Sequence, residues 1–87
     1  IAIVDDYIRV SEDLALRLLT DPTGVTSYRY TITRPNGTTY DSGVLTSSSH
    51  TLTAANKNAT GAYQINLAIT APDSNTFYVP GSFAVNP

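Results

Sequence analysis

Hydrophobic side chains occupy every second position in the stretch Gly61–Thr70. The bulky apolar residues of one parity are Tyr63, Ile65, Leu67 and Ile69. The other parity carries small or polar residues, including Gln64 and Asn66. Because successive side chains of a strand point to opposite faces, the pattern predicts a strand with one face in a core and one outside it.

A second stretch, Ser27–Thr33, has the same period and is rich in aromatic and β-branched residues, which suit a half-buried strand. It continues into Arg34-Pro35-Asn36-Gly37. Since proline cannot donate a ladder hydrogen bond, Pro35 and Asn36 fit best at the centre of a type I turn, followed by a left-handed Gly37. Residues 38–40 then form a short return strand.

Weaker strand patterns cover residues 1–4, 7–10, 44–45, 50–53, 76–79 and 82–85. The pair Pro80-Gly81 between the last two segments suits a kinked edge strand, where a missing donor does little harm. Residues 54–60 indicate a loop or one short helical turn.

Residues 11–20 are compatible with two structures. Ser11 can begin a helix that places Leu14 and Leu18 on one face. Alternatively, Leu14, Leu16 and Leu18 alternate with polar or small residues as in a strand. We favour the strand, because packing routinely overrides the helix propensity of Leu and Ala.

Together these segments give about seven or eight short strands with turn signals every ~8–12 residues, the spacing of a β-sandwich or small barrel. The length of 87 residues suits one all-β domain, 1–87. The chain starts at Ile1 without Met and ends at Pro87. We therefore interpret it as a module of a longer protein.

Charge and composition argue against several classes of protein. The net charge is −2 and the five basic residues do not cluster, which disfavours nucleic-acid binding. No apolar run approaches the ~20 residues of a membrane span, so no membrane insertion is expected. The absence of Cys excludes disulfides and thiolate metal sites.

The sequence Gly61-Ala62-Tyr63, followed by alternating aliphatic residues, resembles the penultimate strand of immunoglobulin-like domains. It is most similar to polycystic-kidney-disease-type repeats and related bacterial and phage surface modules. In the resemblance, Tyr30 takes the place of the core aromatic of the third strand, and the alternating leucines stand for the second strand. Tyr63 matches the tyrosine-corner position, whose hydroxyl bonds to nearby backbone.

The resemblance implies an immunoglobulin-like antiparallel sandwich of two sheets and about seven strands, used as a spacer, adhesive or docking unit. The chain departs from the pattern in lacking Trp and a Cys pair. It also has Ala71-Pro72-Asp73-Ser74 where polycystic-kidney-disease repeats commonly have an Asp-x-x-Gly turn. Apolar contact across Leu16 or Leu18, Tyr30 and Ile65 must then hold the sheets together.

Catalytic and metal chemistry find little support. His50 is the only histidine, and the neighbouring serines 47–49 lack the glycine elbow of a nucleophilic serine. A lone histidine without cysteine cannot complete a zinc site. We therefore expect no enzyme and no cofactor. Calcium is a minor alternative, with Asp5, Asp6 and Asp73 as candidate ligands, although Asp is also a common turn former.

Three tyrosines, Tyr7, Tyr40 and Tyr78, fall off the inward parity or near strand ends and are candidate binding residues. Exposed aromatic faces stack on sugars, and tyrosine is also favoured at protein interfaces. The triplets Asn36-Gly37-Thr38 and Asn58-Ala59-Thr60 match the glycosylation sequon, which matters only in a secretory route.

The sequence thus predicts a non-catalytic spacer or docking module of a cell-surface, secreted or virion protein. Its expected partners are other protein domains, or capsid, tail or surface proteins. The alternative is a carbohydrate-binding module that uses exposed tyrosines to hold glycans.

Overall fold

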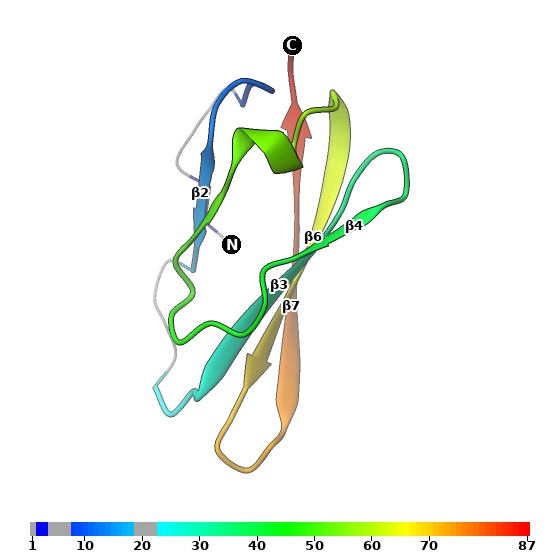
Figure 1. Ribbon diagram of the computed structural model, residues 1–87. Helices are drawn as coiled ribbons and strands as arrows, with labels where there is room; N and C mark the ends of the chain where they lie inside the picture. The colour runs from blue at the N-terminus through cyan, green and yellow to red at the C-terminus, as the bar shows by residue number, and fades with distance from the viewer. Residues whose placement is uncertain (1, 4–7, 19–22) are drawn as a thin grey trace.

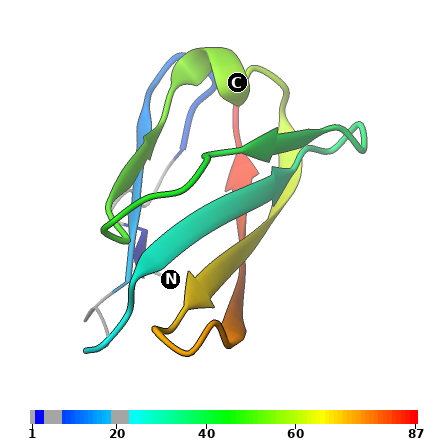
Figure 2. The same cartoon turned by 60° about the horizontal axis from the view of Figure 1, so that its bottom comes forward.

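The computed structural model describes residues 2–3, 8–18 and 23–87, most of which lie in β-strands. The described strands form two antiparallel sheets, which confirms the all-β class (Figures 1 and 2). The smaller sheet has the order β1 (Ala2–Ile3), β2 (Leu14–Arg17), β5 (His50–Leu52). The larger sheet has the order β4 (Thr39–Asp41), β3 (Ser27–Thr33), β6 (Gly61–Thr70), β7 (Thr76–Val85).

The centre of the larger sheet is formed by β3 and β6, whose bounds are those predicted from the alternating pattern. Tyr30 pairs with Leu67 and Ile32 with Ile65, and all four side chains are buried. Along β6 the apolar parity is buried, while Gln64 and its even-numbered neighbours are exposed or half-buried. The predicted assignment of the two faces is therefore confirmed.

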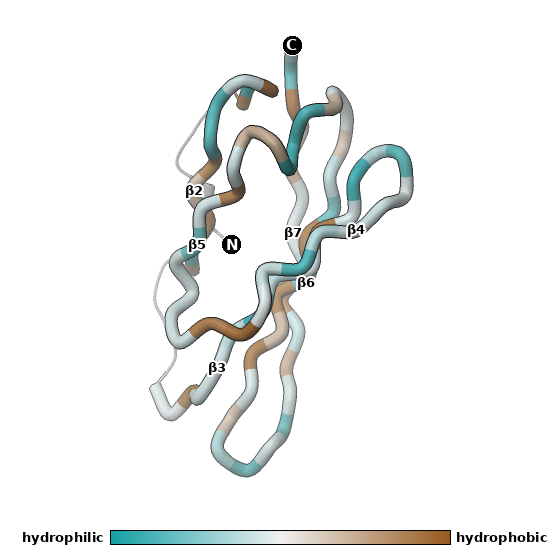
Figure 3. The backbone as a smooth tube through the Cα atoms, in the orientation of Figure 1, coloured by the Kyte–Doolittle hydropathy of each residue, from teal (hydrophilic) through white to brown (hydrophobic). Residues whose placement is uncertain are grey.

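The β3–β4 connection is the predicted type of turn. Gly37 N donates to Arg34 O across 2.9 Å, and Gly37 has a φ of +87°. Asn36 Oδ1 accepts from Thr38 N at 3.0 Å, so the asparagine side chain stabilises the turn that its backbone makes. Figure 3 shows hydrophilic segments gathered at this turn.

The two predicted segments near the C-terminal end form one continuous strand, β7, that passes through Pro80 and Gly81. It lies at the edge of the larger sheet, as predicted. Ala71 N donates to Asn75 O, so these two residues are a hydrogen-bonded pair that continues the β6–β7 ladder. Because hydrogen-bonded and non-hydrogen-bonded pairs alternate in an antiparallel ladder, the odd-numbered residues of β7 direct their N–H and C=O groups toward β6. The nitrogen of Pro80 therefore faces away from β6, and the proline removes no bond from that ladder.

Residues 11–20, whose sequence is compatible with a helix or a strand, contain strand β2. Leu14 and Leu16 are buried there, and Leu18 is half-buried. The helical alternative is therefore wrong for the described part of this region. Residues 50–53 contain β5, and residues 54–60 contain one 3-10 turn, η1 (Ala54–Asn56).

Two weak strand predictions are only partly met. In 44–45, Leu45 makes a single antiparallel bridge to Tyr28 and no strand. Near the N-terminal end, Arg9 makes one parallel bridge to Asn86. Residues 1 and 4–7, which complete the two predicted N-terminal strands, lie outside the described residues.

One apolar core fills the space between the sheets. Its buried members are Ile8, Leu14, Leu16, Tyr28, Tyr30, Ile32, Leu52, Tyr63, Ile65, Leu67, Ile69, Phe83 and Val85. Ser48 is buried with them because it bonds to backbone and core tyrosine alike: its Oγ accepts from Leu18 N at 3.0 Å, and its carbonyl accepts from Tyr30 Oη at 2.8 Å.

Candidate functional site

At one pole of the molecule the N-terminal segment lies beside the end of β7 and runs parallel to it. Asn86 N donates to Ile8 O at 2.8 Å, and Val10 N donates to Asn86 O at 3.0 Å. The Asn86 side chain adds a bond from Nδ2 to Ile8 O at 3.2 Å. We call this group the terminal clamp; its members are Ile8, Arg9, Val10, Lys57 and Asn86.

Lys57 joins the terminal clamp from the loop that follows η1. Its side chain is fully buried, and its Nζ donates to Arg9 O. Burying an ammonium group is costly unless it is hydrogen-bonded, so this contact ties the loop firmly to the N-terminal segment. Sequence reasoning missed Lys57, because a single lysine in a loop carries no periodic signal.

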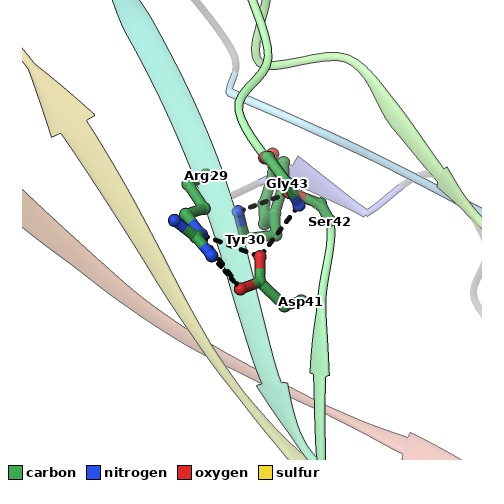
Figure 4. Close-up of polar contacts among 5 residues, drawn as sticks. All are labelled: Arg29, Tyr30, Asp41, Ser42 and Gly43. Carbon is green, nitrogen blue, oxygen red and sulfur yellow. Dashed lines mark hydrogen bonds and ion pairs between the residues drawn. The ribbon is translucent and has the colours of Figure 1, made fainter.

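The outer face of the larger sheet carries an ion pair between β3 and β4 (Figure 4). Arg29 Nε donates to both carboxylate oxygens of Asp41, at 2.8 and 3.0 Å, and Nη2 also contacts Oδ2. The hydrogen bond from Arg29, helped by one from Gly43 N, lowers the pKa of Asp41 to about 2. The same pairing raises the pKa of Arg29. Both side chains remain about half exposed, so the pair contributes little stability.

Tyr78 lies on this same outer face. Its cross-strand neighbour on β6 is Ala68, which in turn pairs with Arg29 on β3. The Tyr78 side chain is 64% exposed, and the small Ala68 beside it leaves the ring open to solvent. Of the predicted binding tyrosines, Tyr78 thus has the exposure that a contact residue needs.

Tyr40 has a different environment. It pairs with buried Ile32, is half-buried, and packs against the core. Its hydroxyl lies 2.8 Å from His50 Nε2. The His50 ring stacks against Tyr30 and Tyr40, with centroid distances of 5.9 and 6.0 Å, and burial lowers the pKa of His50. Tyr7 lies outside the described residues.

The candidate calcium ligands are not brought together in the described structure. Asp5 and Asp6 lie outside the described residues. Asp73 shapes the β6–β7 turn, where Oδ1 accepts from Asn75 N at 3.1 Å and Oδ2 from Asn75 Nδ2 at 2.8 Å. Within residues 2–3, 8–18 and 23–87, no group of three or more His, Asp or Glu side chains is placed to hold a metal ion, and no pocket is found.

Large hydrophobic side chains are exposed at the end of the molecule opposite the terminal clamp. Phe77 is 60% exposed although it pairs with buried Ile69 on the inner face. Val44, in the segment after β4, is 71% exposed. Phe77 and Tyr78 are consecutive in β7, so this edge strand presents one aromatic ring on each face of the sheet.

Comparisons with protein-family models, with curated proteins and with solved structures found no significant match. In the described part of the chain, no helix is long and apolar enough to cross a membrane. Three features can therefore support a proposal of function. They are the terminal clamp, the outer face of the larger sheet with Tyr78, and the edge strand β7 with its exposed rings Phe77 and Tyr78.

Proposed function

We propose that this chain is a non-catalytic, immunoglobulin-like spacer or docking module of a cell-surface, secreted or virion protein. It separates neighbouring parts of that protein and carries load between them. The observation that carries the proposal is the terminal clamp, in which residues 8–10 are hydrogen-bonded in parallel to Asn86 at the end of β7.

The geometry of the chain ends favours a load-bearing role. Ala2 pairs with Arg17, at the end of β2 that is remote from the clamp, whereas Asn86 lies within the clamp. Figure 1 places the C-terminus at the top of the molecule, beyond the end of β7. A pull on the two ends therefore moves the parallel segments in opposite directions. Their hydrogen bonds are loaded together in shear and not one after another.

The shape of the molecule also suits a spacer. Its principal extents are 42 × 24 × 17 Å, so it is longest in one direction. Apart from Arg29, which is paired with Asp41, the outward polar positions at the centre of β3 and β6 carry the neutral residues Thr31, Gln64 and Asn66. A surface of this kind gives little nonspecific attraction to charged or apolar partners and leaves contact to specific edges and loops.

Two contacts support the immunoglobulin-like assignment. Tyr63 Oη donates to Ala59 O at 2.6 Å and accepts from Ala59 N at 3.3 Å, which is the backbone bonding expected of a tyrosine corner. The Tyr63 ring stacks on Phe83 of the neighbouring strand, with centroids 4.9 Å apart. The tyrosine thereby anchors the start of β6 to the loop before it and to β7.

Stretching single molecules held at both ends tests the load-bearing role. Val10→Pro removes the donor to Asn86 O and should lower the unfolding force. Leu52→Ala serves as the matched control, because it costs about 2–5 kcal/mol as a core cavity but leaves the clamp intact. We expect the larger loss of force in Val10→Pro, even where its loss of equilibrium stability is smaller. A force that follows equilibrium stability alone in both variants contradicts the proposal.

A carbohydrate-binding module is the second candidate, and the exposure of Tyr78 favours it. Its ring stands open beside Ala68, with the polar Asn66 two residues along β6 on the same face. A flat aromatic face flanked by amide groups suits a sugar ring. Binding on a glycan array that disappears in Tyr78→Ala supports this candidate, and an array without signal for the wild-type chain contradicts it.

A further inference from the structure

The exposed edge of β7 has an unusual composition. No side chain in residues 74–87 is charged. Edge strands commonly carry charged residues, which prevent them from pairing with other strands. On β7 the only such device is Pro80, and the strand also carries two large exposed rings, Phe77 and Tyr78.

Hydrogen bonds at both ends of β7 fix which backbone groups face outward. The bond from Ala71 N to Asn75 O directs odd-numbered residues toward β6. The bonds of Asn86 with Ile8 and Val10 lie on the opposite side and involve an even-numbered residue. Even-numbered residues of β7 therefore offer their N–H and C=O groups to the outside. Within the described residues, this edge has a backbone partner only at Asn86.

We propose that β7 pairs with β7 of a second copy of this chain, antiparallel and centred on Tyr78, so that the two larger sheets become one continuous sheet. The proposal is independent of the spacer function. The N-terminal segment occupies the edge at Asn86, which leaves the half of β7 near Phe77 for the partner. Figure 1 shows this half of the strand at the free border of the molecule, and Figure 2 agrees.

The register follows from the outward-facing groups and from Pro80. With Tyr78 opposite Tyr78 of the second copy, each tyrosine N–H donates to the carbonyl of the other. Thr76 then lies opposite Pro80 of the second copy, and its N–H donates to the proline carbonyl. The missing donor of Pro80 falls at the outer end of the paired segment, where its loss is least disruptive.

Side chains in this register are complementary to a second copy. On one face Phe77 lies opposite Val79 of the second copy, an aromatic and β-branched cross-strand pair of the kind that stabilises sheets. On the other face the two Tyr78 rings meet across the two-fold axis. A charged residue on this strand would place like charges together in such a pairing, and β7 has none. Self-association therefore covers both exposed rings at once.

The test is sedimentation velocity from micromolar to millimolar chain concentration. Because an edge interface is small, we expect a weak, concentration-dependent dimer. Tyr78→Lys places two ammonium groups across the axis and should abolish the dimer. Thr39→Lys, an exposed substitution on the opposite edge strand β4, is the matched control and should leave dimerisation unchanged. Thermal unfolding checks that both variants remain folded.

Charge exchange tests the register itself. Tyr78→Lys and Tyr78→Glu should each be monomeric alone and should form a mixed dimer when combined, because the two charges then face each other. A wild-type chain that stays monomeric up to millimolar concentration overturns the proposal. Undiminished dimerisation of Tyr78→Lys, or failure of the mixed pair to associate, also overturns it.

Discussion

The hydroxyl of Tyr40 and Nε2 of His50 lie 2.8 Å apart and join β4 to β5, the edge strands of two different sheets. The His50 ring also stacks on Tyr30 in the centre of the larger sheet. His50, on the edge strand of the smaller sheet, therefore contacts two strands of the larger sheet, β3 and β4. Because the ring is partly buried, its charge state is linked to the packing of both sheets.

Stability should decrease as the pH falls below the ordinary histidine range. Burial lowers the pKa of His50 in the folded state below the value of 6.5 that it has when unfolded. The unfolded chain therefore binds a proton first, and the free energy of unfolding drops as the pH falls from about 6.5 toward the lower folded-state pKa. Urea unfolding between pH 8 and pH 5 measures this. His50→Phe keeps an aromatic ring for stacking and should remove this pH dependence of the free energy of unfolding. If the variant shows the same pH dependence as the wild-type chain, His50 is not the group that causes it.

Gly61 and Gly24 should respond differently to alanine. Both have positive φ, +126° and +77°, but a Cβ on Gly61 would lie 3.1 Å from Pro35 Cγ, whereas Gly24 has open space. Gly24→Ala should cost about 1–2 kcal/mol from the backbone alone. Gly61→Ala should cost more, because Pro35 must also move. Chemical denaturation compares the two, and an equal or smaller loss for Gly61→Ala would mean that the contact with Pro35 is not as described.

Tyr63→Phe removes the hydroxyl that bonds to both backbone groups of Ala59 while keeping the ring that stacks on Phe83. We expect a loss of about 1 kcal/mol, typical of one intramolecular hydrogen bond. The measurement is the free energy of unfolding. Tyr78→Phe is the control, since its side chain is exposed, and it should have little effect.

The Arg29–Asp41 pair should matter little at neutral pH. Both side chains are solvent-exposed, and water and salt screen the attraction between exposed charges. The pKa of Asp41 is about 2 in the folded state against an ordinary 3.8. Its contribution is therefore complete above pH 3.8 and is lost as the pH falls through about 2. Asp41→Asn should reduce the fall in the free energy of unfolding between pH 3.8 and about pH 2, and at no other pH. Added salt, which screens the pair, should reduce the same fall.

Sequence alternation was a reliable guide where a strand crosses the whole core. The bounds of β3 and β6 match the prediction, because each inward side chain has a covering partner from end to end. The same alternation over residues 76–79 assigns Phe77 to the inner face of β7, opposite Ile69. It could not indicate that the core ends before that position, because the extent of the opposing sheet is set by other parts of the chain.

Features built from distant segments could not be predicted from the sequence. The sequence predicts Tyr40 as a candidate binding residue, but the β3–β4 register sets it opposite Ile32, where its hydroxyl lies beside His50. Lys57 is buried at the terminal clamp, where its Nζ donates to the carbonyl of Arg9, 48 positions away in the sequence. Neither position carries a local pattern, since the neighbours that decide its environment are remote in sequence.

Paired alanine substitutions on β6 test the central claim that one face of this strand lies in the core and the other in solvent. Ile65 is 3% exposed, and its adjacent neighbour Gln64 points outward. We expect Ile65→Ala to lower the free energy of unfolding by about 2–5 kcal/mol, and Gln64→Ala to change it by less than about 0.5 kcal/mol. Equal effects in the two variants, measured by urea unfolding, would contradict the two-layer account.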